Sequence, residues 1–276
     1  MVNTVGNRIT REISRQIKLT DALERTQIQI STGKRLQRSS DDPVASRRIA
    51  TIGIAQSSIS TWATNIKASQ ARVAQADGAL RSTSTLLARA RELTLAAATG
   101  TSGTADRSAI AAELNAIADE IDGLASTRDS NGEPLFASGN ARVVRFDADV
   151  SFAPVASAAD VFTVNGNSLS TALRDAATAV AAGNGAGINA SLTTLDTAIG
   201  HIADQNAALG LSAGRLERIG ESLSTRGVEI ADERQSIEET DLETAIAQLN
   251  AQNLTLEAAR AAFARVNQQS LFDLLS

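Results

Sequence analysis

The sequence has no cysteine and no tyrosine, and it holds only three prolines and one tryptophan among 276 residues. Without cysteine the chain can form no disulfide, no thiolate metal site and no cysteine nucleophile. Aromatic residues make up 3% of the chain. Because compact cores usually draw much of their buried area from aromatic side chains, we expect thin seams between helices. Long stretches rich in Ala, Leu, Gln, Arg and Glu, which favour helices, indicate the same.

Long apolar runs are also missing. No stretch of about 18 apolar residues is present, which is the length a membrane-spanning helix needs, so we predict no membrane insertion. The N-terminal stretch reads MVNTVGNRITREISRQ and has no apolar run of signal-peptide length. If the protein is exported, we expect a route without a cleaved signal peptide.

Groups that could carry chemistry are few and badly placed for it. His201 is the single histidine, and we interpret it as a surface or seam residue. Asp147 and Asp149 lack the glycine and glutamate that complete a calcium loop. The glycine-rich run at 183–187 has no following Lys-Ser/Thr, as a phosphate loop requires. We predict no enzyme activity, no catalytic residues, no metal and no cofactor.

The charges divide unevenly between the two ends of the chain. Residues 1–48 hold ten Lys and Arg against five Asp and Glu, a net charge of +5, whereas residues 229–276 hold three Arg against nine acids, a net charge of −6. A basic arm could contact nucleic acid, but it has no aromatic side chains for stacking on bases. We favour mutual attraction of the two ends, which can set orientation and register, and predict no nucleic acid partner.

Apolar spacing predicts long helices over most of the chain. They cover residues 4–32, 43–98, 106–124, 168–182 and 188–235, with a last helix that follows a capping box of Thr240 and Glu243. Asp106 is the expected cap of the third helix. Between them, residues 141–165 are richer in Val and Phe, and their periodicity shortens toward two. We predict short strands there.

Both terminal helices carry a heptad seam. The first runs through Ile9, Ile13, Gln16, Thr20, Leu23, Gln27 and Ile30, and the last through Ala245, Leu249, Gln252, Leu256, Ala259, Phe263 and Val266. A half-polar seam buries too little apolar surface to offset the ordering entropy by itself. The predicted assembly interface therefore comprises Ile9, Ile13, Leu23, Ile30, Leu249, Leu256, Phe263 and Val266, together with Leu271, Phe272, Leu274 and Leu275 of the apolar end.

The stretch STGKRLQRSSDDP breaks the helical pattern at residues 31–43. Gly33 stands where a glycine ends a helix, Asp41 or Ser40 offers the next N-cap, and Pro43 lies near the first helical position. We expect its basic residues to face the acidic run at 233–241. The joint, as we call it, comprises Gly33, Lys34, Arg35, Arg38, Asp41, Asp42, Pro43, Glu238, Glu239 and Asp241.

These elements predict a mainly α fold: an elongated, hairpin-like rod of long antiparallel helices, with coiled-coil terminal helices and a small β-containing insert in mid-chain. The expected segments are a terminal helix at 1–40, the first half of the rod at 41–140, the insert at 141–187, the returning helix at 188–236 and the second terminal helix at 237–276. Loop closure over long chains costs little extra per doubling of length, so both ends of the chain can meet.

Four stretches resemble the bacterial flagellin family. They read STGKRLQRSSDDPVASRRIA, then ADRSAIAAELNAIADEIDGLAS with NGEPLFASG, then AALGLSAGRLERI, and finally TDLETAIAQLNAQNLTLEAARAAFARVNQQSLFDLL. The resemblance covers about four-fifths of the chain. The Ser-Asp-Asp-Pro and SLFDLL motifs of this chain are similar to those of the hook–filament junction branch of the family. Filament flagellins more often have D-D-A-A-G at the first place and a final L-L-R.

The resemblance implies a structural subunit of the extracellular flagellum, exported unfolded by the flagellar type III apparatus with an export chaperone. It also implies a helical homo-oligomer next to another hook-associated protein and flagellin. The terminal helices would form the inner layers and fold during assembly. Two alternatives stand beside the junction protein: the filament flagellin itself, and a signalling coiled coil such as a chemoreceptor hairpin. The latter class lacks a β insert and sits beside membrane spans.

Overall fold

The computed structural model describes the backbone of residues 2–99, 103–129 and 131–272, and the side chains of residues 10–99, 103–129 and 131–265. Its helices are α1 (Val2–Thr32), α2 (Pro43–Ala98), α3 (Thr104–Ala125), α4 (Ala158–Phe162), α5 (Leu169–Ala181), α6 (Gly185–Glu238) and α7 (Leu242–Phe272). The mainly α prediction is confirmed, and Pro43 and Ala98 bound the second helix as expected.

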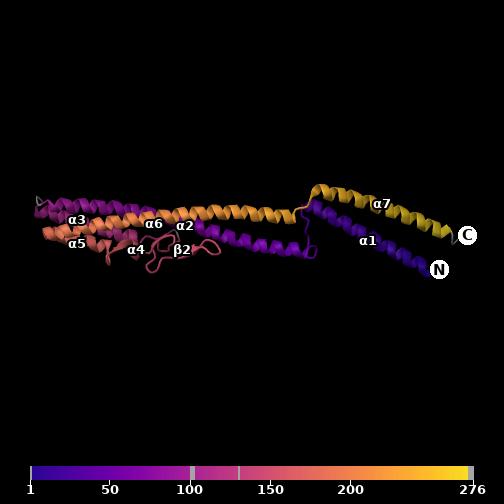
Figure 1. The fold of residues 1–276 in the computed structure, drawn as a ribbon, viewed down its shortest axis with the longest axis horizontal. Helices are drawn as coiled ribbons and strands as arrows, with labels where there is room; N and C mark the ends of the chain where they lie inside the picture. The colour runs from indigo at the N-terminus through magenta and orange to yellow at the C-terminus, as the bar shows by residue number, and fades with distance from the viewer. Residues whose placement is uncertain (1, 100–102, 130, 273–276) are drawn as a thin grey trace. The chain divides into compact units, whose positions relative to one another are not determined.

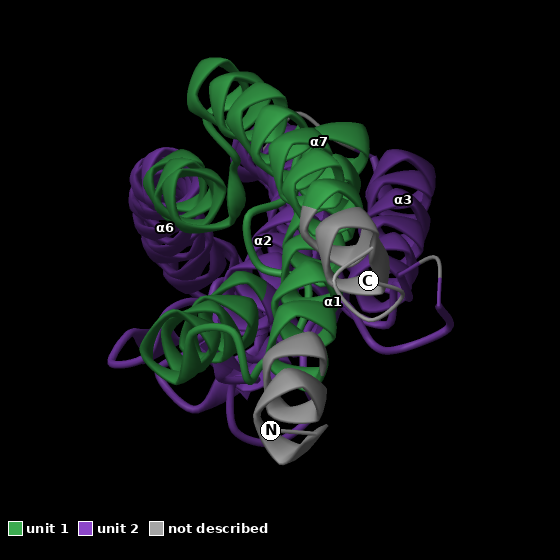
Figure 2. Cartoon of the chain, turned by 90° about the vertical axis from the view of Figure 1, so that its right-hand side faces the viewer, with its two compact units in different colours: residues 1–56, 227–276 green, residues 57–226 purple. Residues whose placement is uncertain are grey.

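The chain divides into two compact units (Figure 2). Unit 1 holds residues 1–56 and 227–276, and unit 2 holds residues 57–226. The long helices α2 and α6 contribute to both units, while α1 and α7 belong to unit 1 and α3, α4 and α5 to unit 2.

Within unit 2 the core follows a seven-residue repeat on both long helices, which is the seam spacing of a coiled coil. The repeat on α2 passes through Ile66, Val73, Leu80, Leu87 and Thr94, all buried. The repeat on α6 passes through Ile188, Leu195, Ile202, Leu209, Leu216 and Leu223, also all buried. Helices α3 and α5 lie side by side against this core (Figure 1).

The insert contains less β-structure than its sequence suggests. Its strands are two residues each: β1 (Val144–Arg145) pairs with β2 (Ser151–Phe152), and β3 (Thr163–Val164) pairs with β4 (Asn167–Ser168). The short helix α4 occupies part of the stretch expected to be strand, because Ser157 and Asp160 form a capping box at its start. The strand prediction rested on the Val content and the alternating pattern of this stretch, and neither of them signals a helix cap.

Aromatic side chains pack in pairs within the insert and just before it. Phe136 and Phe162 meet edge to face with ring centroids 5.1 Å apart, and Phe146 and Phe152 lie 4.7 Å apart. Such pairs contribute beyond the area they bury. Four of the six phenylalanines of the chain therefore form two ring pairs, whereas the buried seven-residue repeats of α2 and α6 are mainly aliphatic.

In unit 1, α1 and α7 lie side by side along their length (Figure 1). α1 ends and α7 begins at the joint, so the two helices run antiparallel. Thr26 is the one buried residue on the described part of α1, residues 10–32, and Ala245 and Leu256 are the buried residues on residues 242–265 of α7. This pair buries far less than the helices of unit 2.

Candidate assembly interface

The joint begins where α1 stops. Gly33 has φ +68°, the left-handed conformation that ends a helix and that a glycine adopts without strain. The Thr240 N–H donates to the Gly33 carbonyl at 3.0 Å, and the Arg35 N–H donates to the Glu238 carbonyl at 2.8 Å. These two bonds join the basic and acidic segments as one antiparallel bridge between Lys34 and Glu239.

Opposite charges add to this backbone contact. Lys34 Nζ lies 3.8 Å from Glu238 Oε2, and the Arg35 guanidinium donates to the Ile237 carbonyl at 3.2 Å. Glu238 also accepts from Arg234 Nε at 2.8 Å. The Glu238 carboxylate thus serves two cations, and exposed pairs of this kind contribute roughly 0–1 kcal/mol each. Their stronger effect is to set which segments meet.

The helix caps at the joint differ from those expected. Asp42, not Asp41 or Ser40, caps α2, because its Oδ1 accepts from the N–H groups of Val44 at 3.1 Å and Ala45 at 3.0 Å. Asp41 is turned back into the loop, where its Oδ2 accepts from the Arg38 N–H at 2.8 Å. Arg38 is therefore bound to Asp41 through its backbone N–H, and the expected contact of its side chain with the acidic run stays a prediction.

At the start of α7, Asp241 replaces the expected cap Thr240. Asp241 Oδ1 accepts from the N–H groups of Glu243 at 3.1 Å and Thr244 at 3.2 Å. The Thr240 hydroxyl has no hydrogen-bond partner among the described residues, and its N–H donates to the Gly33 carbonyl instead of to the Glu243 side chain, so neither half of the expected capping box forms. The Asp106 prediction fails similarly: α3 begins after Gly103, and Asp106 instead accepts from the Gly103 N–H at 3.0 Å. In each case the neighbouring turn decided which side chain faces the helix end.

Hydrogen bonds lower the pKa values of two carboxyl groups of unit 1. The pKa of Asp241 is lowered, first by the Thr244 hydroxyl, which donates at 2.7 Å, and then by the backbone N–H groups it caps. The pKa of Glu233 is lowered by its hydrogen bond from Arg48, whose own pKa is raised by the same contact. Arg48 thereby pairs within the chain instead of presenting a free cation to nucleic acid.

The α7 seam lies toward α1. Leu256 is buried, and Leu249 and Phe263 are half-buried, at the spacing drawn from the sequence. On α1, Leu23 and Ile30 are half-buried, but Ile13 is 46% exposed. The least exposed line on the described part of α1 passes through Gln16, Leu19, Leu23, Thr26 and Ile30, of which Thr26 is buried. The seam drawn from the sequence shares Gln16, Leu23 and Ile30 with this line, but it also passes through Thr20 and Gln27, which are exposed, and it omits Leu19 and Thr26.

Six members of the predicted interface lie outside the described side chains: Ile9, Val266, Leu271, Phe272, Leu274 and Leu275. The role of the whole set in assembly stays a prediction.

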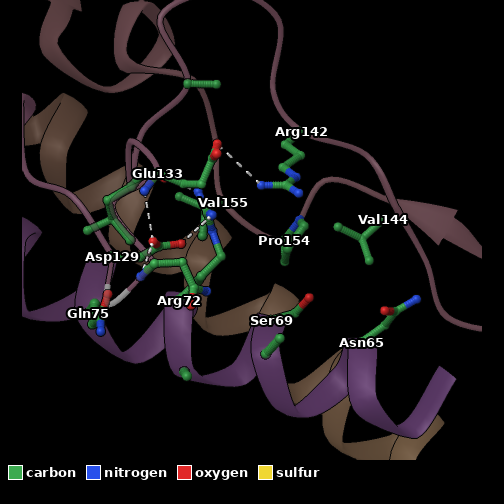
Figure 3. Close-up of a pocket in the computed structure, with 15 residues that line it drawn as sticks. Asn65, Ser69, Arg72, Gln75, Asp129, Glu133, Arg142, Val144, Pro154 and Val155 are labelled. Atoms are coloured by element: carbon green, nitrogen blue, oxygen red, sulfur yellow. Dashed lines mark hydrogen bonds and ion pairs between the residues drawn. The ribbon is translucent and has the colours of Figure 1, made fainter. Parts of the chain in front are cut away.

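A pocket of about 410 Å³ opens in unit 2 between α2 and the segment at 129–155 (Figure 3). Arg72 enters it from α2 and pairs with Asp129 at 2.8 Å, with side chains 16% and 7% exposed. Arg72 also donates to the carbonyls of Pro134 and Leu135, and Asp129 accepts from the Asn131 and Glu133 N–H groups. These groups hold the loop on α2. Sequence reasoning missed Arg72, since nothing in its spacing marks it.

Asp147 and His201, which the sequence offered as possible metal ligands, make contacts that hold the fold together. Asp147 accepts from Arg226 Nη1 with both carboxylate oxygens, at 3.0 and 3.1 Å, and Arg215 covers the Phe152 ring at 4.1 Å. Both contacts fasten the β1–β2 hairpin to α6. His201 Nε2 lies 2.9 Å from the Asp160 carbonyl. Among the described residues, no three His, Asp or Glu side chains are grouped as a metal site would need.

None of the described helices has the length and apolar character to cross a membrane. The model of the bacterial flagellin N-terminal helical region matches residues 6–141, and that of the C-terminal helical region matches residues 192–275. The chain belongs to the bacterial flagellin family. In this flagellin-family chain the two matched regions meet at the joint, and the insert lies mostly between them.

Two relatives match part of the chain. The flagellar hook-associated protein 3 of Salmonella typhimurium is 30% identical over 119 residues, which cover 43% of this chain and 38% of that protein. The protein of the same name from Escherichia coli is 30% identical over 109 residues, 40% of this chain and 34% of that one. The matched part of this chain thus spans little more than a third of either relative.

A solved structure shows the same fold. The putative flagellar hook-associated protein from Vibrio parahaemolyticus superposes with a TM-score of 0.65 at 21% identity, over 72% of this chain and 100% of that one. At 21% identity this similarity shows the fold of the flagellin-family chain and nothing about its role.

Proposed function

We propose that this chain is a structural subunit of the bacterial flagellum, which self-assembles through its terminal helices and acts as the adaptor at the hook–filament junction. Two relatives carry the name of a flagellar hook-associated protein, and the Ser-Asp-Asp-Pro and SLFDLL segments resemble the same branch.

The observation that carries this proposal is the incomplete burial of α1 and α7. Ile13, Ile17 and Ile28 on α1, and Leu242, Ile246 and Leu254 on α7, are 40–69% exposed. Full burial of such a side chain contributes roughly 1.5–3 kcal/mol. Apolar surface on both helices is thus available to neighbouring copies, which supports self-assembly through the terminal helices.

The proposed location is the extracellular flagellum, reached without a cleaved signal peptide. The proposed partners are further copies of this chain, a neighbouring hook-associated protein, flagellin, the flagellar type III export apparatus and an export chaperone. A structural role fits the family, and we assign no enzyme activity. The alternative is the filament flagellin itself, which the names of the relatives favour less.

Deletion of the gene separates these two functions. A junction protein is expected to leave hooks without filaments and to release flagellin into the medium, and the plasmid-borne gene should restore both. Electron microscopy of the cells and immunoblots of the medium provide the readouts. Mutant cells that keep filaments of changed number or composition would instead establish the filament flagellin.

A further inference from the structure

One polar contact between side chains joins α1 and α7 within their seam. Thr26 is 3% exposed, and its Oγ1 lies 3.0 Å from Gln252 Oε1 on α7. The same hydroxyl lies 3.0 Å from the Ala22 carbonyl of its own helix. A hydroxyl has one proton, so the two oxygens share it. A buried polar group costs stability unless it is hydrogen-bonded. The presence of a polar pair at a buried seam position therefore needs an explanation.

The residues on either side of the contact are aliphatic. On α1 the neighbouring seam positions are Leu23 and Ile30, and on α7 they are Leu249 and Leu256. In the observed register a polar residue faces a polar residue. A slip of three or four residues would place the Gln252 amide among the aliphatic side chains of α1 and leave the Thr26 hydroxyl facing a leucine.

We propose that Thr26 and Gln252 specify the register in which α1 and α7 pair. A single polar layer in a coiled-coil seam is known to select register at a cost in stability. The seam positions beside this layer can meet aliphatic partners in several registers of the α1–α7 pair. The polar layer therefore makes these registers differ in stability. The inference rests on the proposed function in one respect: in an assembly, α1 could also meet the α7 of another copy, and the same layer would align that pair.

The two members of the pair should respond differently to substitution. Thr26→Val removes the donor and leaves the Gln252 oxygen in the seam without the contact that the structure gives it. Gln252→Leu leaves Thr26 its bond to the Ala22 carbonyl. We therefore expect Thr26→Val to weaken the helix pair more than Gln252→Leu does, and the double variant to recover most of this loss, since two apolar residues then meet.

The register can be measured directly because the chain has no cysteine. Lys18→Cys and Arg260→Cys introduce spin labels at exposed positions of α1 and α7, and double electron–electron resonance on the purified full chain reports their distance. With Thr26 and Gln252 present we expect one narrow distribution. With T26V/Q252L we expect a second population, in which one helix has moved by about 5 Å along the other, the rise of three to four residues.

Thr20→Val is the matched control. Thr20 lies on the same helix, is exposed and bonds only to its own turn through the Gln16 carbonyl at 3.0 Å, so its loss should leave the distance unchanged. An unchanged single distance in T26V/Q252L overturns the proposal. So does a loss of pairing in that variant, which would make the contact a source of stability, or a broad distribution in the native pair. No other flagellar protein is present, so these outcomes are independent of the junction role.

Discussion

At the scale of the residue, two carboxylates fix where the helices at the joint begin. Asp42 caps α2 and Asp241 caps α7, each through one oxygen that accepts two backbone N–H groups. A helix start leaves its first N–H groups without partners inside the helix. The two caps satisfy these groups, and together with Gly33 they fix the direction in which the chain enters and leaves the joint.

The lowered pKa of Asp241 predicts a dependence on pH. Its folded value lies below the ordinary 3.8, so the cap stabilises the fold fully above that value, and the contribution is lost as the pH falls through the lower folded pKa. Far-UV circular dichroism of the full chain between about pH 5 and about pH 2 measures the loss. The neutral D241N variant should lose less helix over this range, and identical acid profiles would contradict the prediction.

At the scale of the element, one ion pair fastens a loop to a helix. Arg72 and Asp129 are both largely buried, and between them they engage two backbone carbonyls and two backbone N–H groups of the loop at 129–135. A buried charge that loses its partner is strongly destabilising, whereas an exposed pair contributes little. The loop is therefore ordered by side chains that lie far apart in the sequence.

Asp129→Ala should lower the free energy of unfolding by about 3 kcal/mol, because Arg72 would stay buried without its partner. Asp77→Ala is the matched control on α2, since Asp77 forms an exposed pair with Arg81, and its effect should stay below about 0.5 kcal/mol. Urea unfolding followed by circular dichroism gives both values. Equal losses in the two variants would show that the Arg72 contact does not order the loop.

The heptad line of α6 makes a second prediction. Leu216 is fully buried on that line, whereas Leu211 on the same helix is 77% exposed. Leu216→Ala should cost about 3 kcal/mol of unfolding free energy through lost burial and the cavity it leaves, while Leu211→Ala should change it by less than about 0.5 kcal/mol. The same denaturation measurement tests the pair, and similar costs would place the buried line elsewhere.

At the scale of the whole molecule, the two units differ in how much they bury. The core of unit 2 extends from Ile66 to Leu223 and includes four of the phenylalanines. In unit 1 the α1–α7 seam contains a polar layer and only two buried apolar residues on the described part of α7. Regions with few buried apolar contacts open with lower free energy than a packed core.

Hydrogen exchange should reveal this difference. In the free chain we expect the amides of residues 10–32 and 242–265 to exchange faster than those of residues 66–94 and 188–223, because opening α1 and α7 exposes little apolar surface. Mass spectrometry of peptides from the exchanged chain measures both sets. Protection of the terminal helices equal to that of the unit 2 core would show that α1 and α7 do not open more readily than that core.

The apolar end of the chain supplies a further prediction. Removing Leu271–Ser276 should prevent incorporation into flagella, since a subunit that assembles through its terminal helices would lose four apolar side chains. Circular dichroism should show an unchanged melting transition for unit 2, as none of its residues is altered. Normal motility of cells carrying only the truncated chain would exclude a role for this end.

The sequence by itself determined the long helices of this protein. Heptad spacing predicted the long helices, Pro43 and Gly33 marked their ends, and the opposite charges around Lys34 and Glu238 indicated which segments meet. These features are local or depend on composition, so one chain without a partner structure reveals them. The motifs also led to the family, because they cover the matched regions at 6–141 and 192–275.

Only the tertiary structure decided which side chains fill each role. Asp42 and Asp241 became the caps because the turns before them aim those carboxylates at the helix starts. Arg72 contacts Asp129, which lies 57 residues away in the sequence, and Thr26 contacts Gln252, which lies 226 residues away. Heptad spacing placed Gln252 in the seam, but its partner on α1 is supplied by packing between distant segments. Spacing along one chain cannot contain that information.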